Sequence, residues 1–154
     1  MRKTRRTLVA GSATLAILLL VLAPAHAQGM KWRGSGGRSP GDAYGRLYDA
    51  KTVETVTGEV VKVDRIVPMR GMSGGIHVVV KTDKGEVSVH LGPQWYLENQ
   101  DVKIAPKDTV TVTGSQVTVQ EQSALIDAEV KKGADVLTLR DVAGVPVWAG
   151  WRRP

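Results

Sequence analysis

The sequence predicts an all-β domain with one short helix, closed into a small barrel. Two observations predict it. Stretches rich in Val, Thr and Ile recur at short spacing after residue 52, separated by Gly, Pro and Asp residues that are typical of turns. A single helical stretch, opened by Gly92-Pro93, lies between the third and the fourth of them. Strands in this order around one helix favour a five- to six-stranded Greek-key barrel of the OB-fold type.

The first predicted strand is long and bent. Its alternation slips at Val60-Val61, which predicts a bulge, and Gly58 permits the bend. The second and third strands form a hairpin around Asp83-Lys84-Gly85. An immunoglobulin-like sandwich is the alternative, but it needs more strands and has no place for the helix. The strands are predicted over 55–67, 76–82, 86–91, 109–113 with an extension to 119, 123–130 and 135–140, and the helix over 94–99.

The first 27 residues are typical of a signal peptide. Basic residues precede an apolar run from Leu8 to Leu22, and Ala25-His26-Ala27 places small residues where a signal peptidase reads the chain. The run is shorter than the roughly 18 apolar residues of a membrane-spanning helix. We therefore expect cleavage after Ala27 and export to a bacterial periplasm, with no membrane anchor after cleavage.

The mature chain is expected to begin with a tether. Residues 28–51 are rich in Gly and Ser, which predicts a flexible linker and a lead-in that could hold one turn of helix. The folded domain is then predicted over 52–154, and it ends in an aromatic tail.

The charge of the whole chain is misleading about the folded domain. The sequence has 21 basic and 15 acidic residues, a net charge of +6. Four basic residues lie in the predicted signal and three in the linker, so 14 basic residues face 15 acidic ones from Asp42 onward. A nucleic-acid surface needs clustered Lys and Arg, which this balance disfavours. The absence of cysteine excludes disulfides, c-type haem attachment and thiolate metal sites.

Three stretches resemble bacterial exported OB-fold proteins: residues 56–60 (VTGEV), 90–96 (HLGPQWY) and 106–114 (PKDTVTVTG). The general pattern is similar to the YgiW/YdeI type of stress-tolerance proteins. The fuller pattern, which includes residues 139–148, looks closer to the C-terminal domain of the magnetosome-associated MamS and MamX proteins, over roughly residues 52–151. Such relatives can carry CXXCH haem motifs in neighbouring domains. This chain has no cysteine, so that haem role does not transfer, and we expect no cofactor.

Two histidines are candidate metal ligands. The cleanest hairpin register places His77 and His90 side by side across the strands, within reach of one metal ion. A type I turn with a glycine bulge at Asp83-Lys84-Gly85 would shift the pairing and separate them. Met69 and Met72 precede His77, and thioethers with histidine suit copper(I).

Several other residues are candidates for binding a ligand or a partner. They are the loop residues Met69, Arg70 and Met72, the adjacent Trp95 and Tyr96, and the tail residues Trp148 and Trp151. Each aromatic residue has a structural alternative, because Trp95 or Tyr96 can plug the barrel and the tail can bury one Trp.

The motifs favour a protein that is not an enzyme. The sequence has no nucleophile elbow, no HExxH pattern and no phosphate loop. We therefore expect a periplasmic binding or adaptor module that engages a protein partner or a small ligand. A copper- or zinc-handling protein is the alternative, and oligonucleotide or oligosaccharide binding, by analogy of fold, is the third hypothesis. The sequence does not indicate the ligand or the oligomeric state.

Overall fold

Strand β1 (Val53–Ile66) is the strand around which the sheet is built. In the computed structural model, which describes residues 36–150, its first half pairs with β4 and its second half with β2. Glu59 pairs with Lys81 on one side and with Thr109 on the other. The other strands are β2 (Gly75–Thr82), β3 (Gly85–Pro93), β4 (Thr109–Val119), β5 (Gln122–Lys132) and β6 (Asp135–Thr138), with helix α1 (Gln94–Leu97) between β3 and β4.

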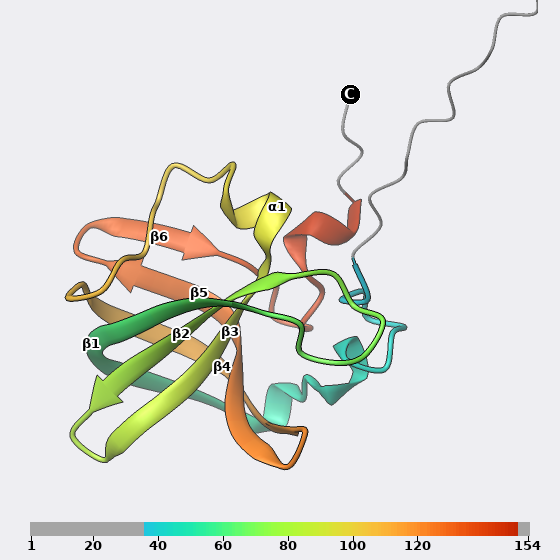
Figure 1. Cartoon of the computed structure of the whole chain (residues 1–154), viewed down its shortest axis with the longest axis horizontal. Helices are drawn as coiled ribbons and strands as arrows, with labels where there is room; N and C mark the ends of the chain where they lie inside the picture. Colours follow the sequence, from blue (N-terminus) through green and yellow to red (C-terminus); the bar gives the residue numbers. More distant parts are fainter. Residues whose placement is uncertain (1–35, 151–154) are drawn as a thin grey trace, which may run out of the picture. The chain divides into compact units, whose positions relative to one another are not determined.

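The six strands close into a barrel-like ring (Figure 1). They follow the order β3-β2-β1-β4-β5-β6, and a parallel pairing of β3 with β5 completes the ring. All other pairs are antiparallel. Strand order, closure and the position of α1 match an OB-fold-like barrel with one extra strand, β6. The predicted fold class is confirmed.

The predicted bulge in β1 is also confirmed. The register of β1 against β2 shifts between Val60 and Lys62. Val60 is fully buried, whereas Val61 is exposed. A Cβ atom on Gly58 would overlap the carbonyl oxygen of Lys81, so only glycine fits where the two halves of β1 change partners. The bulge and this glycine give β1 the coil that lets one strand serve both sides of the barrel.

The barrel interior is filled mostly by aliphatic side chains. Alternate residues of each strand point inward, as a pleated strand requires. One end is closed by two aromatic residues, Tyr96 from α1 and Trp148 from a short 3-10 helix (Val147–Gly150), with ring centroids 5.4 Å apart. The fully buried members of this core are Val60, Val78, Val80, Val89, Leu91, Val110, Val112, Leu125, Val130 and Leu139.

Part of the predicted linker belongs to the folded unit. Arg38 and Tyr44 are 1% and 2% exposed, and Tyr44 leads a second, smaller apolar cluster with Val117 and Ile126. Two single-turn 3-10 helices, Gly45–Leu47 and Ala50–Thr52, carry the chain from there into β1. The lead-in has the helical turn that was expected of it. In the part of the linker before it, Arg38 is buried and its guanidinium lies over the Tyr44 ring, which differs from the expected flexible linker. Residues 28–35 and the predicted signal peptide lie outside the described residues.

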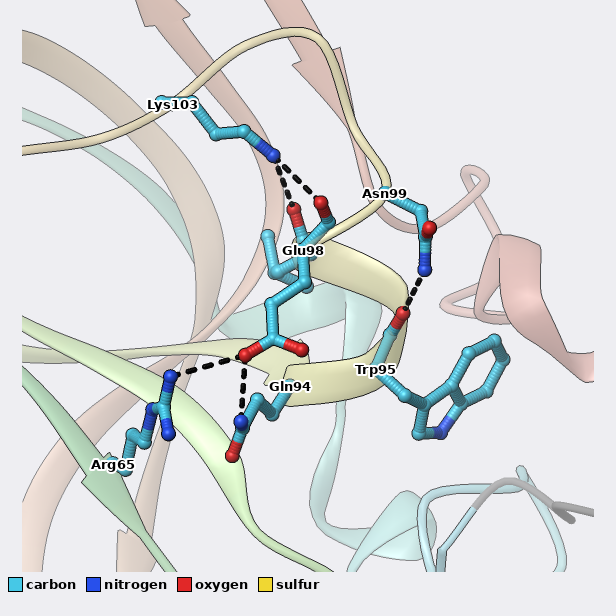
Figure 2. A network of polar contacts seen from close by, with 7 residues as sticks. Arg65, Gln94, Trp95, Glu98, Asn99 and Lys103 are labelled. Carbon is cyan, nitrogen blue, oxygen red and sulfur yellow. Dashed lines mark hydrogen bonds and ion pairs between the residues drawn. The ribbon is translucent and has the colours of Figure 1, made fainter.

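Helix α1 is a single turn held at its ends by side chains (Figure 2). Lys103 donates to the carbonyl oxygens of Leu97 and Glu98 at 3.4 and 2.8 Å, which satisfies the last turn. One oxygen of the Glu98 carboxylate, Oε1, accepts from both Gln94 and Arg65. The helix is shorter than the predicted stretch of 94–99, since residues 98 and 99 form a turn instead.

Trp148 is a core residue, and this corrects its assignment as a candidate partner-binding residue. We expect Trp148→Ala to lower the free energy of unfolding by about 3–5 kcal/mol, because it leaves a large cavity at the barrel end. Urea unfolding followed by circular dichroism measures the change. Val142→Ala is the control: Val142 is 97% exposed, so its effect should stay within about 0.5 kcal/mol. A loss for Trp148→Ala no larger than that of the control would contradict the assignment to the core.

Candidate functional site

A cavity of about 310 Å³ opens on the outer face of the barrel, where three separate segments meet. The first is the end of β1 and the start of the loop to β2. The second is the central part of the β2–β3 hairpin. The third is the turn between β4 and β5. The lining residues are Ile66, Val67, Pro68, His77, Ser88, His90, Val119, Gln120, Gln122 and Ala124.

The two candidate histidines lie together in this cavity. His77 pairs directly with His90, and their rings meet edge to face with centroids 5.3 Å apart. The hairpin closes through Thr82 and Gly85 with only Asp83 and Lys84 between them. That two-residue turn confirms the first of the two predicted registers and shows the bulged alternative to be wrong.

His77 makes one hydrogen bond on its cavity side. Its Nε2 atom lies 2.5 Å from the hydroxyl of Ser88, and its Nδ1 atom is buried and has no hydrogen-bond partner among residues 36–150. Burial lowers the pKa of His77, while the nearby Asp64 carboxylate acts in the opposite direction. The ring is therefore favoured in its neutral form.

His90 is covered by the segment before β1. The Tyr44 ring stacks on it at 6.0 Å, and the Tyr44 hydroxyl lies 2.9 Å from His90 Nδ1. Burial lowers the pKa of His90 to about 4, and the charges of His77 and Arg38 act in the same direction. Burial also raises the pKa of Tyr44 to about 12. At neutral pH the contact thus joins a protonated phenol and a neutral imidazole.

The two methionines do not join the histidines in the cavity lining. Met69 and Met72 pack against the apolar cluster around Tyr44 instead. Arg70, between them, is exposed. Within residues 36–150 no group of three or more His, Cys, Asp or Glu side chains could hold a metal ion. The copper set of Met69, Met72 and His77 stays a prediction, with His77 in the cavity lining and the two methionines outside it.

The aromatic candidates also lie away from the cavity. Tyr96 is 6% exposed and plugs the barrel, as one of the two alternatives predicted. Trp95 is half-buried, packs against the main core and meets Tyr96 edge to face. Trp151 lies outside the described residues. None of the described aromatic candidates forms a stacking surface in the cavity.

Sequence reasoning missed four polar residues of the site: Tyr44, Ser88, Gln120 and Gln122. Tyr44 was hidden in the Gly-rich stretch, although it is one of only three tyrosines in the chain. Gln120 and Glu121 form the β4–β5 turn with φ values of 49° and 64°. Two residues in the left-handed conformation suit a two-residue hairpin turn. Gly, Asn or Asp usually occupy such positions, so Gln120-Glu121 was not recognised as a turn from the sequence. For Ser88, the sequence indicated no role beyond its position two residues before His90 on the same strand.

A second polar group lies buried in the barrel wall. Arg140 donates to the carbonyl oxygens of Asp127 and Gly144 and stacks on the rings of Tyr48 and Trp148. Burial raises the pKa of the Asp127 carboxyl well above its usual range, against the opposing charge of Arg140. This group ties the chain after β6 to β5, and its members do not line the cavity.

The residues that line the cavity lie within the part of the chain that matches a known protein family. The model of the MamS/MamX magnetosome protein family matches residues 52–137. No curated protein matches the chain. The matched range contains every residue that lines the cavity, but not Tyr44, which covers His90. The MamS/MamX part of the resemblance found in the sequence is confirmed, and the likeness to the YgiW/YdeI type stays a prediction.

The low pKa of His90 predicts that acid destabilises the fold. In the unfolded chain the pKa returns to its ordinary value of 6.5, so between 6.5 and about 4 the unfolded chain binds more protons. The contribution of His90 to the free energy of unfolding should therefore fall by about 3 kcal/mol as the pH drops through this window. Urea unfolding across the window measures the loss.

The variant His90→Gln isolates this contribution from those of the carboxyl groups, and it should lose clearly less stability over the same range. The ring protons of His90, followed by NMR, provide an independent readout. A titration of these protons near pH 6.5 in the folded protein would contradict the assignment.

Proposed function

We propose that this chain, which belongs to the MamS/MamX magnetosome protein family, is a non-enzymatic binding module that holds a polar group of a partner protein or small ligand in the cavity beside His77. The position of the cavity carries this proposal. It lies over β2 and β3, between the β1–β2 and β4–β5 connections. This is the place at which OB-folds bind their ligands.

The lining determines what kind of ligand fits. His77, His90 and Ser88 supply ring nitrogens and a hydroxyl, and Gln120 and Gln122 supply amides. None of these groups carries a charge at neutral pH when the imidazoles are neutral, so the cavity favours neutral, hydrogen-bonding groups. A polyanion such as a nucleic acid would find no cationic side chain among the lining residues.

We propose that the contact between Ser88 and His77 serves binding and not catalysis. A serine nucleophile needs a base whose ring is oriented by a third group. In the described part of the chain His77 Nδ1 has no hydrogen-bond partner, and the nearby Asp64 forms an ion pair with Lys62 at 2.8 Å. This arrangement supports a role in binding rather than in catalysis.

The proposed location is the periplasm. Its support is the composition of residues 1–27, which is typical of a cleaved signal peptide. Within residues 36–150 no helix combines the length and the apolar character that a membrane crossing requires. N-terminal sequencing of the protein recovered from a periplasmic fraction, expected to begin at Gln28, tests this location.

Binding to the cavity can be tested with a panel of N-acetyl amino-acid amides, followed by ¹⁵N NMR. We expect shift changes confined to the lining residues, most of all for amides with polar side chains. His77→Ala and Gln120→Ala should each weaken binding about tenfold, since a lost hydrogen bond to a buried group costs about 1–2 kcal/mol.

Lys81→Ala, on the same strand but outside the cavity, is the matched control and should bind normally. Shift changes gathered around Trp95 instead would contradict the assignment of the site. Binding of single-stranded DNA that survives about 200 mM salt would contradict the proposed ligand class.

Metal binding is the second candidate, and the pairing of the histidines favours it. The two ring centroids are 5.3 Å apart, and no described residue forms a hydrogen bond with His77 Nδ1. A periplasmic copper or zinc ion bound there would still need further ligands from solvent or from a partner, because metal sites of this kind use three or four.

Titration with copper or zinc separates the two candidates. If the second is correct, micromolar metal should shift the ring signals of both histidines, and His77→Ala or His90→Ala should each abolish the effect. Tryptophan fluorescence gives an additional readout. Ring signals that do not move at micromolar metal exclude this candidate and leave the first untouched.

A further inference from the structure

The closure between β3 and β5 is short, and it leaves two strand edges open. The strands pair at only two positions, Val89 with Leu125 and His90 with Ile126. Before these positions, residues 86–88 pair with β2 on one side only, and residues 122–124 pair with β4 on one side only. The two strands therefore separate from the closure toward the β2–β3 turn. We refer to this opening as the seam.

The backbone of β3 presents hydrogen-bonding groups to the seam. In an antiparallel pair, alternate residues turn their N–H and C=O groups toward the partner strand and away from it. A two-residue turn closes only through a pair that exchanges both hydrogen bonds, here Thr82 and Gly85. Gly85 and Val87 thus face β2. The backbone groups of Glu86 and the N–H of Ser88 face the seam, whereas the C=O of Ser88 takes part in the parallel pairing of Val89 with Leu125.

A second hollow of about 210 Å³ lies along the seam and continues the first cavity. Ser88 and Ala124 line both. The remaining lining residues of this second hollow are Glu54, Glu86, Val87, Gln116, Ser123 and Leu125. Together the two hollows form one groove that runs from the β2–β3 turn region past Ser88 to His77.

The end of this groove farther from His77 is acidic. Glu54 and Glu86 are exposed and line it, and neither belongs to an ion pair within the described part of the chain. A basic side chain would complement these two carboxylates. The other end, in contrast, offers the neutral amides and imidazoles of the cavity.

We propose that the partner of this groove is an extended, basic peptide segment that adds as a strand to the edge of β3. Its backbone pairs with Glu86 and Ser88, a Lys or Arg side chain lies against Glu54 and Glu86, and a polar side chain enters the cavity beside His77. The distance from Glu86 to His90 along a strand is about 13 Å, which four peptide residues span. Strand addition combines backbone hydrogen bonds with pockets for alternate side chains, and the groove offers both. The inference rests on the proposed function and names the partner class for the same site.

The first test uses peptides selected from a random phage-displayed library, resynthesised and added to ¹⁵N-labelled protein. In the free protein the amides of Glu86 and Ser88 should exchange with solvent faster than that of Val87. The bound peptide should slow both by at least about tenfold. N-methylation of alternate peptide amides should abolish binding, because it removes donors from the new strand pair.

The second test compares proline on the two open edges. Glu86→Pro removes an N–H that faces the seam, and it should weaken peptide binding at least tenfold. Glu86→Gln keeps that N–H and should weaken binding only two- to fivefold, through the lost charge. Val136→Pro on β6 is the matched control: Lys132 and Asp135 close another two-residue turn, so the N–H of Val136 faces away from β5. Its binding should be unchanged.

The outcomes separate this inference from the proposed function. Polar amides that bind the cavity when no peptide is selected would overturn the inference and leave the proposed function standing. If Val136→Pro weakens peptide binding and Glu86→Pro does not, the peptide adds to β6, and this result would also overturn the inference. Self-association that Glu86→Pro abolishes would show that a second copy, not a partner, occupies the edge. Circular dichroism checks that each variant folds, and the N-methyl peptides test the inference without any change in the protein.

Discussion

The coil of β1 at its bulge is the constraint on which the rest of the structure depends. One strand has to pair with β4 along its first half and with β2 along its second, so it must turn sharply where the partners change. Gly58 has no Cβ atom, which would overlap the carbonyl oxygen of Lys81. The register shift between Val60 and Lys62 increases the local twist of the strand. This turn carries the β2–β3 hairpin over the barrel to meet β5. Strands β3 and β5 pair at only two positions. This pairing closes the barrel and leaves the seam open beside it.

The candidate site follows from that geometry. A longer pairing of β3 with β5 would cover Glu86, Ser88 and the neighbouring hollow. The two-position closure instead keeps a polar groove open on a protein whose interior is aliphatic. His90 sits at the closure itself and is shielded by Tyr44. The segment before β1 therefore has a part in the site, because it removes one imidazole from water and keeps that ring neutral.

Much of the fold could be predicted because its signals are local. The slip at Val60-Val61, the turn at Asp83-Lys84 and the opening of α1 at Gly92-Pro93 each act within a few residues. The pairing of His77 with His90 was one of two alternatives, and turn length decided between them. Tyr44 and Gln120 were missed for physical reasons. Tyr44 is buried through contacts with His90, which lies 46 residues away in the chain. Gln120 adopts a left-handed conformation that glutamine rarely adopts, so its residue type does not predict the turn.

The sequence by itself determined the strand order, the single short helix, the near-neutral charge of the domain and the absence of any thiol chemistry, since these depend on composition and on neighbouring residues. Only the tertiary structure decided which candidates share a site. It placed Trp148 and Tyr96 in the core, turned Met69 and Met72 toward Tyr44, and brought His77, Ser88 and Gln120 together. Closure of a barrel joins residues far apart in the chain, and no local pattern records where the closing strands stop pairing.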